Sequence, residues 1–193
     1  MTKEERINDF VEYWTKRVDP VKDMMCSTES LVNFLDENGF FTAPASAKYH
    51  GNVEGGLYVH SKAVCHRLEM LTHNNELTWT LPRSPYVVGM FHDLCKCDDY
   101  VEKQGTLVDQ VFFNYGTHYE YNPNPIFKGH GAKSVMFLSQ LIKLTEEEVV
   151  CIRYHMGAYE KDDWAELDRA IKKYENVLWT HQADMLACKV DDV

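Results

Sequence analysis

The sequence lacks any long apolar run. No stretch of its 193 residues reaches the roughly 18 consecutive apolar positions that a membrane-spanning helix requires. The opening segment, MTKEERINDFVEYWTKRVD, is charged from its third position and has no apolar core of the kind found in secretory signal peptides. We therefore expect no membrane partner and a cytoplasmic location.

The sequence also lacks an excess of basic residues. It holds 20 lysines and arginines against 30 aspartates and glutamates, a formal net charge of −10. Because non-specific binding to polynucleotides is mostly electrostatic, we expect no extended nucleic-acid surface. A local basic pocket, or bound divalent cations, would still be compatible with this balance.

Cysteines are few, and their spacing is not that of a zinc ribbon. In a reducing cytoplasm we expect all six to be free thiols. Only Cys95 and Cys97 lie close together in the sequence. Such a pair could bind a metal or respond to redox state, but no second close pair completes a zinc-ribbon spacing.

Repeats, linkers and low-complexity segments are missing as well, and the apolar pattern along the chain is mostly helical. The 45% apolar content suffices for one domain with a sizeable core. Ile7, Phe10, Val11, Trp14 and Val18 form one stripe at helical spacing. We predict an all-α helical bundle with helices over residues 3–18, 28–39, 57–73, 86–95, 129–143, 145–157, 163–174 and 177–189.

One segment departs from the helical pattern. Residues 107–125 are rich in aromatic and β-branched residues, contain a central glycine and end in two prolines, which indicates a loop or a short β-hairpin. The aromatic side chains from Phe112 to Tyr121 could stack on a nucleobase, or they could pack against the domain.

The histidines are the most informative residues. Each of four lies in an apolar or glycine-rich context: His60 in LYVHS, His92 in GMFHDL, His130 in KGHGA and His155 in RYHMG. Asp184 lies in the apolar stretch HQADML, where a carboxylate needs a counter-charge or a metal. A helical bundle can bring such side chains to one point. Imidazole and carboxylate together favour Mn, Fe, Co, Ni or Zn over Ca.

Each of these residues also has an ordinary structural interpretation. His60 could be a hydrogen-bonded core histidine, and His130 a simple loop residue. Histidine at the position of His155 is favoured by the dipole at a helix end. Asp184 could be a paired core acid. His181 lies three residues before Asp184 and is expected to support the site or to pack rather than to bind a metal.

The five segments GGLYVHS, FHDLCK, GHGAKS, RYHMG and HQADM, in this order, resemble the HD superfamily of metal-dependent phosphohydrolases. Within it they are most similar to bacterial HD proteins of the kind of the YhaM-type exonucleases. The resemblance implies one HD-type domain over residues 1–193. Its metal-site core would cover about residues 55–190, with the helices of residues 3–39 packed on it.

The resemblance also implies a ligand set. His60, His92, Asp93 and Asp184 match the ligands of a first metal, and His130 and His155 match the extra histidines of two-metal members, in which the HD aspartate bridges both ions. Lys96 matches a phosphate-contacting lysine. Two positions depart from the family: Cys95 stands where a glycine is common, and Tyr154-His155 stands where several members have paired histidines.

The expected chemistry is hydrolysis of a phosphoester in a nucleotide. A hydroxide held between two divalent transition-metal ions would attack phosphorus, with Asp93 and Lys96 as catalytic residues and Lys133 and Arg153 as further phosphate contacts. The favoured substrate is a cyclic or short oligonucleotide diester. The alternatives are a one-metal 5′-nucleotidase or nucleoside triphosphate hydrolase, and a non-catalytic nucleotide sensor. The sequence leaves the oligomeric state open.

Overall fold

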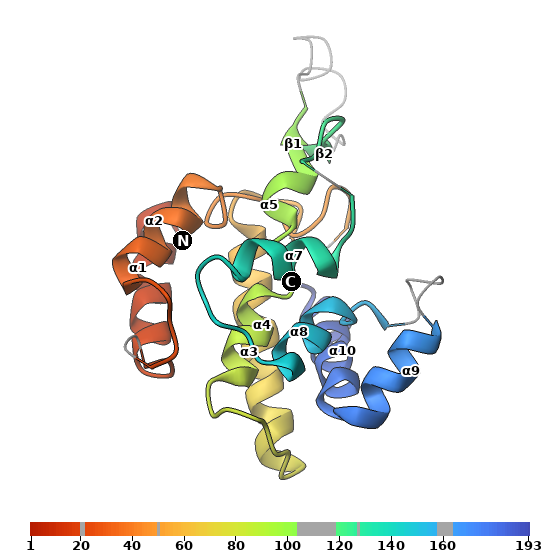
Figure 1. Ribbon diagram of the computed structural model, residues 1–193. Coiled ribbons are helices and arrows are strands. Elements are labelled where there is room, and N and C mark those ends of the chain that lie inside the picture. Colours follow the sequence, from red (N-terminus) through yellow and green to blue (C-terminus); the bar gives the residue numbers. More distant parts are fainter. Residues whose placement is uncertain (20–21, 50, 104–118, 127, 158–163) are drawn as a thin grey trace.

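The computed structural model describes residues 1–19, 22–49, 51–103, 119–126, 128–157 and 164–193. Within these ranges the chain is mostly helical, with one small antiparallel sheet of two strands (Figure 1). The prediction of an all-α fold with a short hairpin is confirmed. None of the helices described is both long and apolar enough to cross a membrane.

The helices of the described ranges follow the predicted order. They are α1 (Lys3–Thr15), α2 (Thr28–Glu37), α3 (Gly56–Asn74), α4 (Ser84–Phe91), α5 (Lys96–Asp99), α7 (Gly131–Leu138), α8 (Glu146–Arg153), α9 (Trp164–Lys173) and α10 (Asn176–Leu186). A π-helical turn, Ala187–Asp191, continues α10. Helix α5 was not predicted, and four helices end earlier than predicted: α1 at Thr15, α4 at Phe91, α7 at Leu138 and α8 at Arg153. The early end of α4 matters, because it leaves His92 and Asp93 in a turn beside the site.

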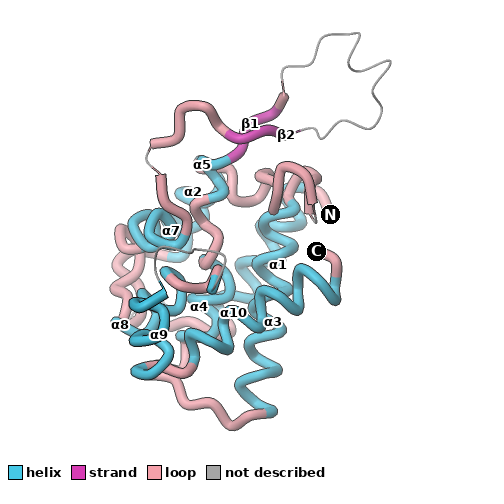
Figure 2. The backbone as a smooth tube through the Cα atoms, turned by 90° about the vertical axis from the view of Figure 1, so that its right-hand side faces the viewer, coloured by secondary structure: helices cyan, strands magenta, loops and turns pink. Residues whose placement is uncertain are grey.

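The hairpin begins earlier than the sequence pattern predicted. Strand β1 (Tyr100–Glu102) pairs with β2 (Tyr119–Tyr121), and Tyr100 lies opposite Tyr121. The hairpin projects beyond α5 in both views (Figures 1 and 2). Most of the aromatic segment, residues 104–118, lies outside the described residues. At its described end, Tyr119 is buried and Tyr121 is 69% exposed.

An aromatic cluster joins the N-terminal helices to the helices that carry the site. Phe10 and Trp14 of α1 are fully buried, and their ring centroids lie 6.3 and 5.3 Å from that of Phe91 in α4. Phe40 and Phe41, which follow α2, complete the cluster. Burial of such rings is among the largest apolar contributions that a side chain can make to stability. Helices α1 and α2 are therefore fixed against the rest of the fold.

Helix α3 runs along α4 and α10, and α10 also packs against α8 (Figure 2). The approach of α3 to α4 is close at Gly89, where a Cβ atom would lie 2.7 Å from the main chain of Cys65. Only glycine allows this contact. As a result, His60 on α3, His92 after α4 and Asp184 on α10 face one another.

A buried ion pair locks α8 to the start of α4. The Arg83 guanidinium donates to both carboxylate oxygens of Glu148, at 3.1 and 3.2 Å, and also to the main-chain carbonyls of Asp23 and Lys143. Ser84 is the first residue of α4, and its hydroxyl donates to Glu148 at 3.0 Å. Arg83 and Glu148 are 3% and 0% exposed. Removal of either partner would leave the other charge buried.

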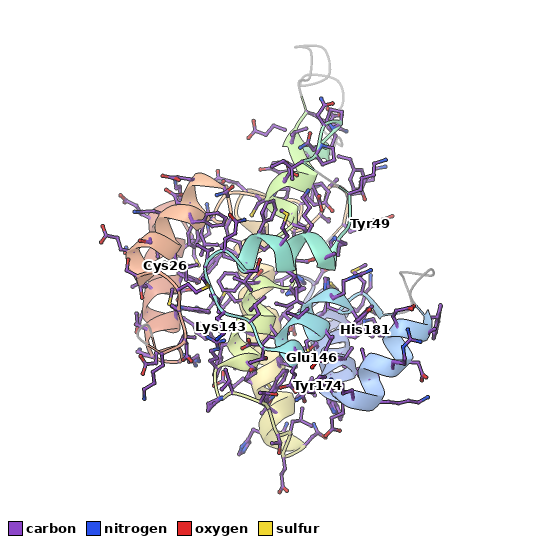
Figure 3. All side chains as sticks on the ribbon, viewed as in Figure 1. Cys26, Tyr49, Lys143, Glu146, Tyr174 and His181 are labelled. Atoms are coloured by element: carbon purple, nitrogen blue, oxygen red, sulfur yellow. The ribbon has the colours of Figure 1, made fainter. Side chains whose placement is uncertain are left out.

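Glu148→Gln should lower the free energy of unfolding by about 3–5 kcal/mol, because it leaves the Arg83 charge buried without a counter-charge. Urea denaturation measures this. Glu146→Gln is the matched control on the same helix. Glu146 lies at the surface beside Tyr174 (Figure 3), where its partner Lys173 is also exposed, so the denaturation midpoint should not move. Equal midpoints for both variants would show that the buried pair does not stabilise the fold.

Candidate metal centre

The predicted metal ligands meet at one place in the structure. His60 lies on α3, His92 and Asp93 in the turn after α4, His130 immediately before α7, His155 in the turn after α8 and Asp184 on α10. Asp93 is at the centre of the arrangement, since its two carboxylate oxygens face two different groups of histidines. These groups are called the first and second clusters below.

The first cluster consists of His60, His92 and Asp184, with one oxygen of Asp93 beside it. The donor atoms of the three residues lie within 4.8 Å of one another, and all three residues are buried. His60 Nε2 is 3.2 Å from His92 Nε2 and 3.3 Å from Asp184 Oδ1. Asp93 Oδ2 lies 3.5 Å from His60 Nε2 and 3.3 Å from His92 Nε2. Imidazole and carboxylate donors gathered in this way can hold a metal ion.

The second cluster consists of His130, His155 and the other oxygen of Asp93. Asp93 Oδ1 lies 2.8 Å from His130 Nε2 and 3.3 Å from His155 Nε2. All three atoms are buried, and none makes a hydrogen bond. A buried polar atom without a partner is costly, so three that converge on one point indicate a missing ligand. A cation bound between them would satisfy all three.

Three of the histidine rings are oriented by the main chain. The Nδ1 atoms donate to main-chain carbonyls: His60 to Val193 at 3.0 Å, His92 to Gly89 at 2.9 Å and His155 to Ile152 at 2.7 Å. Because a carbonyl oxygen only accepts, the proton of the neutral ring lies on Nδ1 and the lone pair lies on Nε2. In each case Nε2 faces the clusters. Metal-binding histidines are typically oriented in this way.

The charges of the clusters are strongly coupled. Burial alone would lower the pKa of His60, but Asp184 and Asp93 raise it to about 9. Burial alone would raise the pKa of Asp93, but Lys96 and His92 hold it well below its usual range. The pKa of Asp184 is lowered as well, chiefly by His60 against the effect of burial. In the metal-free protein, protonated histidines therefore supply countercharge to the carboxylates.

The three predicted phosphate contacts differ in their positions. Lys96 lies at the centre, with its Nζ atom 2.5 Å from Asp93 Oδ2. Lys133 is fully buried and its ammonium pairs with Asp98 at 2.5 Å and Asp99 at 2.7 Å, so its charge is held by these carboxylates. Arg153 lies half-buried over the ring of Tyr154. Of the three, Lys96 is thus the one for which the structure shows an ion pair with a cluster residue.

His181, which was expected to support the site or to pack, contacts the turn that carries His155. Its Nδ1 atom donates to the main-chain carbonyl of His155 at 2.8 Å. The turn around His155 comes close to this ring: Gly157 has a φ of +56°, and a Cβ atom there would lie 2.9 Å from the ring of His181. Helix α10 therefore contacts both clusters, one through Asp184 and the other through His181.

Sequence reasoning named Cys95 only as part of a possible metal-binding pair with Cys97, and it identified neither the contact of Cys95 with His130 nor that of Cys188 with Asp184. Cys95 Sγ lies 3.2 Å from His130 Nδ1, and Cys188 Sγ donates to Asp184 Oδ1 at 3.4 Å. Asp93, Cys95 and His130 also form a group whose donor atoms lie within 4.8 Å of one another. The available signals were the cysteine that replaces a glycine beside Lys96, and the four-residue spacing of Cys188 from Asp184.

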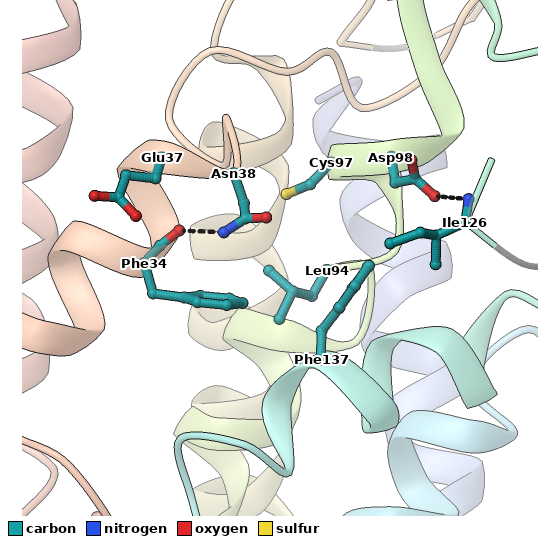
Figure 4. Close-up of a pocket in the computed structure, with 8 residues that line it drawn as sticks. All are labelled: Phe34, Glu37, Asn38, Leu94, Cys97, Asp98, Ile126 and Phe137. Atoms are coloured by element: carbon teal, nitrogen blue, oxygen red, sulfur yellow. Dashed lines mark hydrogen bonds between the residues drawn. The ribbon is translucent and has the colours of Figure 1, made fainter. Parts of the chain in front are cut away.

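Leu94 lines a cavity of about 280 Å³, and none of the cluster residues is among the described residues of its walls (Figure 4). Its walls come from the end of α2, from α5 and from α7, and they include the rings of Phe34 and Phe137. The charged residues among its walls are Glu37 and Asp98, both acidic. Without a cation in its lining the cavity does not suit a phosphate group, and we do not assign it to the substrate of the clusters.

Comparison with protein-family models, with curated proteins and with solved structures found no match to this chain. The interpretation of the clusters therefore rests on the residues themselves.

Binding of a divalent metal should release about two protons at pH 7, one each from His60 and His130. The pKa of His60 is about 9, and that of His130 is raised well above its usual value, with Cys95 and Asp93 outweighing burial. Affinity for the metal should therefore increase as pH rises towards 9. Calorimetric titration in two buffers of different ionisation enthalpy measures the released protons. Tight binding with no proton release would contradict the assignment.

The stability of the metal-free protein should show the opposite trend with pH. The raised pKa of His60 stabilises the fold fully below its unfolded value of 6.5, and this contribution is lost as pH rises through about 9. The stabilising contributions of Asp93 and Asp184, whose pKa values are lowered, persist over the same pH range. The melting temperature of the metal-free protein should thus fall between pH 7 and 9, while that of the metal-loaded protein should not.

Gly157→Ala should weaken metal binding, because the new methyl group must displace His181 or the turn that carries His155. Gly39→Ala is the matched control. Its φ is +81°, but the nearest atom to its Cβ would be Thr42 Oγ1 at 3.5 Å. Both variants should lose about 1–2 kcal/mol of stability from left-handed backbone strain. Only Gly157→Ala should also bind less metal, as measured by elemental analysis; equal binding in both would exclude a role for this contact.

Proposed function

We propose that the protein is a metal-dependent phosphohydrolase of the HD type that acts on a phosphodiester bond in a nucleotide. The observation that carries the proposal is the position of Asp93, which presents one oxygen to each cluster. A carboxylate between two groups of imidazoles is suited to bridge two cations. The order of the five sequence segments, which resembles the HD superfamily, supports the same conclusion.

The ligand sets fit this proposal. His60, His92, Asp184 and Asp93 Oδ2 would hold one divalent ion, and His130, His155 and Asp93 Oδ1 would hold the other. Mn, Fe, Co, Ni and Zn suit these donors. Bound divalent ions would supply Lewis acidity, which polarises phosphoryl oxygens and makes water acidic enough to react at neutral pH.

Lys96 is the residue best placed to act on the substrate. Its ammonium lies 2.5 Å from Asp93 Oδ2 and is buried, and Asp93 raises its pKa against the effect of burial, so it stays charged at neutral pH. A fixed positive charge beside a phosphoryl group neutralises the negative charge that develops in the transition state. We assign this role to Lys96. Lys133, whose charge is held by Asp98 and Asp99, would instead support the site.

Two features favour a small nucleotide over a long polymer. The net charge of −10 disfavours binding along a polyanion. The ring of Tyr121, which is largely exposed, lies 5.4 Å from that of Tyr100, the residue that follows α5 and Lys96. An exposed aromatic ring packed on Tyr100, whose hydroxyl is near enough to Lys96 to influence its pKa, offers a stacking face for a nucleobase. A cyclic or short linear nucleotide diester fits both features.

A one-metal phosphomonoesterase is the second candidate. It is favoured by the composition of the second cluster, which has Asp93, His130 and His155 as donors, with Tyr154 where several two-metal members of the HD superfamily have another histidine. In that case only the first cluster would hold a metal. His130 and His155 would then line the substrate site, and nucleoside monophosphates or triphosphates would be the substrates.

The metal content of the protein tests the proposal. After incubation with Mn²⁺, protein purified without a metal-affinity tag should contain close to two ions per chain, and Asp93→Ala should contain far fewer. His130→Ala and His155→Ala should each keep about one ion. His66→Ala, an exposed histidine on the same helix as His60, is the matched control and should bind as the wild type does. An absence of bound metal in the wild type would refute the proposal.

Activity separates the candidates once the metal content is known. Hydrolysis of nucleotide diesters should fall at least about 100-fold in His130→Ala and His155→Ala, because each variant loses charge stabilisation in the transition state. If both variants keep their activity, and monoesters are the better substrates, the one-metal phosphomonoesterase is correct. Saturable nucleotide binding without turnover, with both metals present, would instead support a nucleotide sensor.

A further inference from the structure

We propose that the thiol of Cys95 is the positioning residue of the second cluster, and that it takes the place of the carbonyl groups that orient the other histidines. This inference rests on the metal centre of the proposed function. The Nδ1 atoms of His60, His92 and His155 donate to main-chain carbonyls. His130 Nδ1 faces Cys95 Sγ at 3.2 Å.

The local backbone does not by itself fix the orientation of the His130 ring. His130 has non-helical dihedral angles, lies immediately before α7 and stands between two glycines, of which Gly129 has a φ of +127°. Its side chain is 24% exposed, more than those of His60, His92 and His155, which are fully buried. The ring is thus less confined by packing. A contact at Nδ1 is what aims Nε2 at Asp93.

Both ends of the contact with the thiol are fixed. The Cys95 side chain is buried, and its main-chain N–H donates to the hydroxyl of Ser134 at 3.0 Å. Ser134 lies in the first turn of α7, where its own N–H donates to the carbonyl of His130 at 3.2 Å. The turn that carries Asp93 and Cys95 is therefore tied to the helix start that carries His130. Nδ1 faces the sulfur while Nε2 faces Asp93 Oδ1, 2.8 Å away; with a metal on Nε2, the remaining ring proton would lie on Nδ1, where the sulfur can accept it.

Removal of the thiol would expose His130 to a competing partner. Asp99 Oδ2 lies 3.8 Å from His130 Nδ1, beyond hydrogen-bonding distance, and the Asp99 carboxylate is held by Lys133. Without sulfur beside Nδ1, the ring can turn towards Asp99, and Nε2 then moves away from Asp93. The donor atoms of His155 and Asp93 would remain, but the second cluster would lose one of its three donors.

Titration with Co²⁺ tests the proposal. Cys95→Ala should bind the first ion as the wild type does and the second about 10–100-fold more weakly, the usual cost of removing a group that orients a metal ligand. Cys95→Ser, which keeps an acceptor at this position, should restore the second affinity to within a few-fold of the wild type. Cys97→Ala is the matched control. Its side chain lines the cavity of Figure 4, away from the clusters, and both affinities should be unchanged.

The spectrum of the Co²⁺ protein distinguishes positioning from direct ligation. A thiol that orients His130 gives no thiolate-to-cobalt charge-transfer band in the near ultraviolet. A strong band that disappears in Cys95→Ala would show that sulfur binds the metal itself, and this would overturn the proposal. Equal affinity for the second ion in the wild type and Cys95→Ala would overturn it as well.

A metal-independent measurement separates this proposal from the proposed function. Nitrogen-15 NMR of the imidazoles in metal-free protein reports which ring nitrogen carries the proton. Cys95→Ala should shift the His130 ring signals and leave those of His60 unchanged, whereas Cys97→Ala should shift neither. If the wild type binds no second ion but these shifts occur, the two-metal function fails and the positioning by Cys95 stands. Unchanged His130 signals in Cys95→Ala would refute the positioning.

Discussion

The buried carboxylate of Asp93 is the constraint on which the rest of the site depends. The Asp93 carboxylate is only 2% exposed, and a buried charge is tolerated only if other groups neutralise it. The elements around it supply such groups. Lys96 supplies a permanent positive charge at 2.5 Å, and the histidines supply charge only while they hold protons. Protons and metal ions are thus alternative countercharges for the same carboxylate, which links metal binding to pH.

The remaining scaffold keeps the imidazoles in place around that charge. The main-chain carbonyl of Gly89 in α4 orients His92, and that of Ile152 in α8 orients His155. Helix α10 contacts the turn of His155 through His181. The Arg83–Glu148 pair ties α8 to the start of α4 far from the clusters. Preorganisation of this kind lowers the cost of gathering ligands when a metal binds.

The helices and the metal ligands could be predicted from sequence because their signals are local. Thr145 and Glu148, three residues apart, form a capping box at the start of the predicted helix. Each predicted ligand lies in an apolar or glycine-rich segment, where a polar side chain indicates a specific partner. The second role of Glu148, the burial of Lys133 and the contact of Cys95 with His130 could not be predicted. Each depends on residues more than 30 positions apart, and no periodicity or motif records such pairings. The early end of α4 was missed because the apolar pattern continues through Leu94 after the helix hydrogen bonding stops.

The charge of the site explains how an acidic protein could attract a phosphate ester. Once His60 and His130 have lost the protons that a metal displaces, Asp93 and Asp184 outweigh Lys96, and the clusters without metal would carry a net negative charge that repels an anion. One divalent ion reverses the sign, and a second makes the site strongly positive within an otherwise negative surface. Low-dielectric walls focus the electric field of a charge that they surround, and the buried Asp93 lies within such walls. Affinity for the anionic substrate should therefore depend on metal occupancy more than on any basic side chain. This dependence explains why a single permanent cation, Lys96, would be enough at the site.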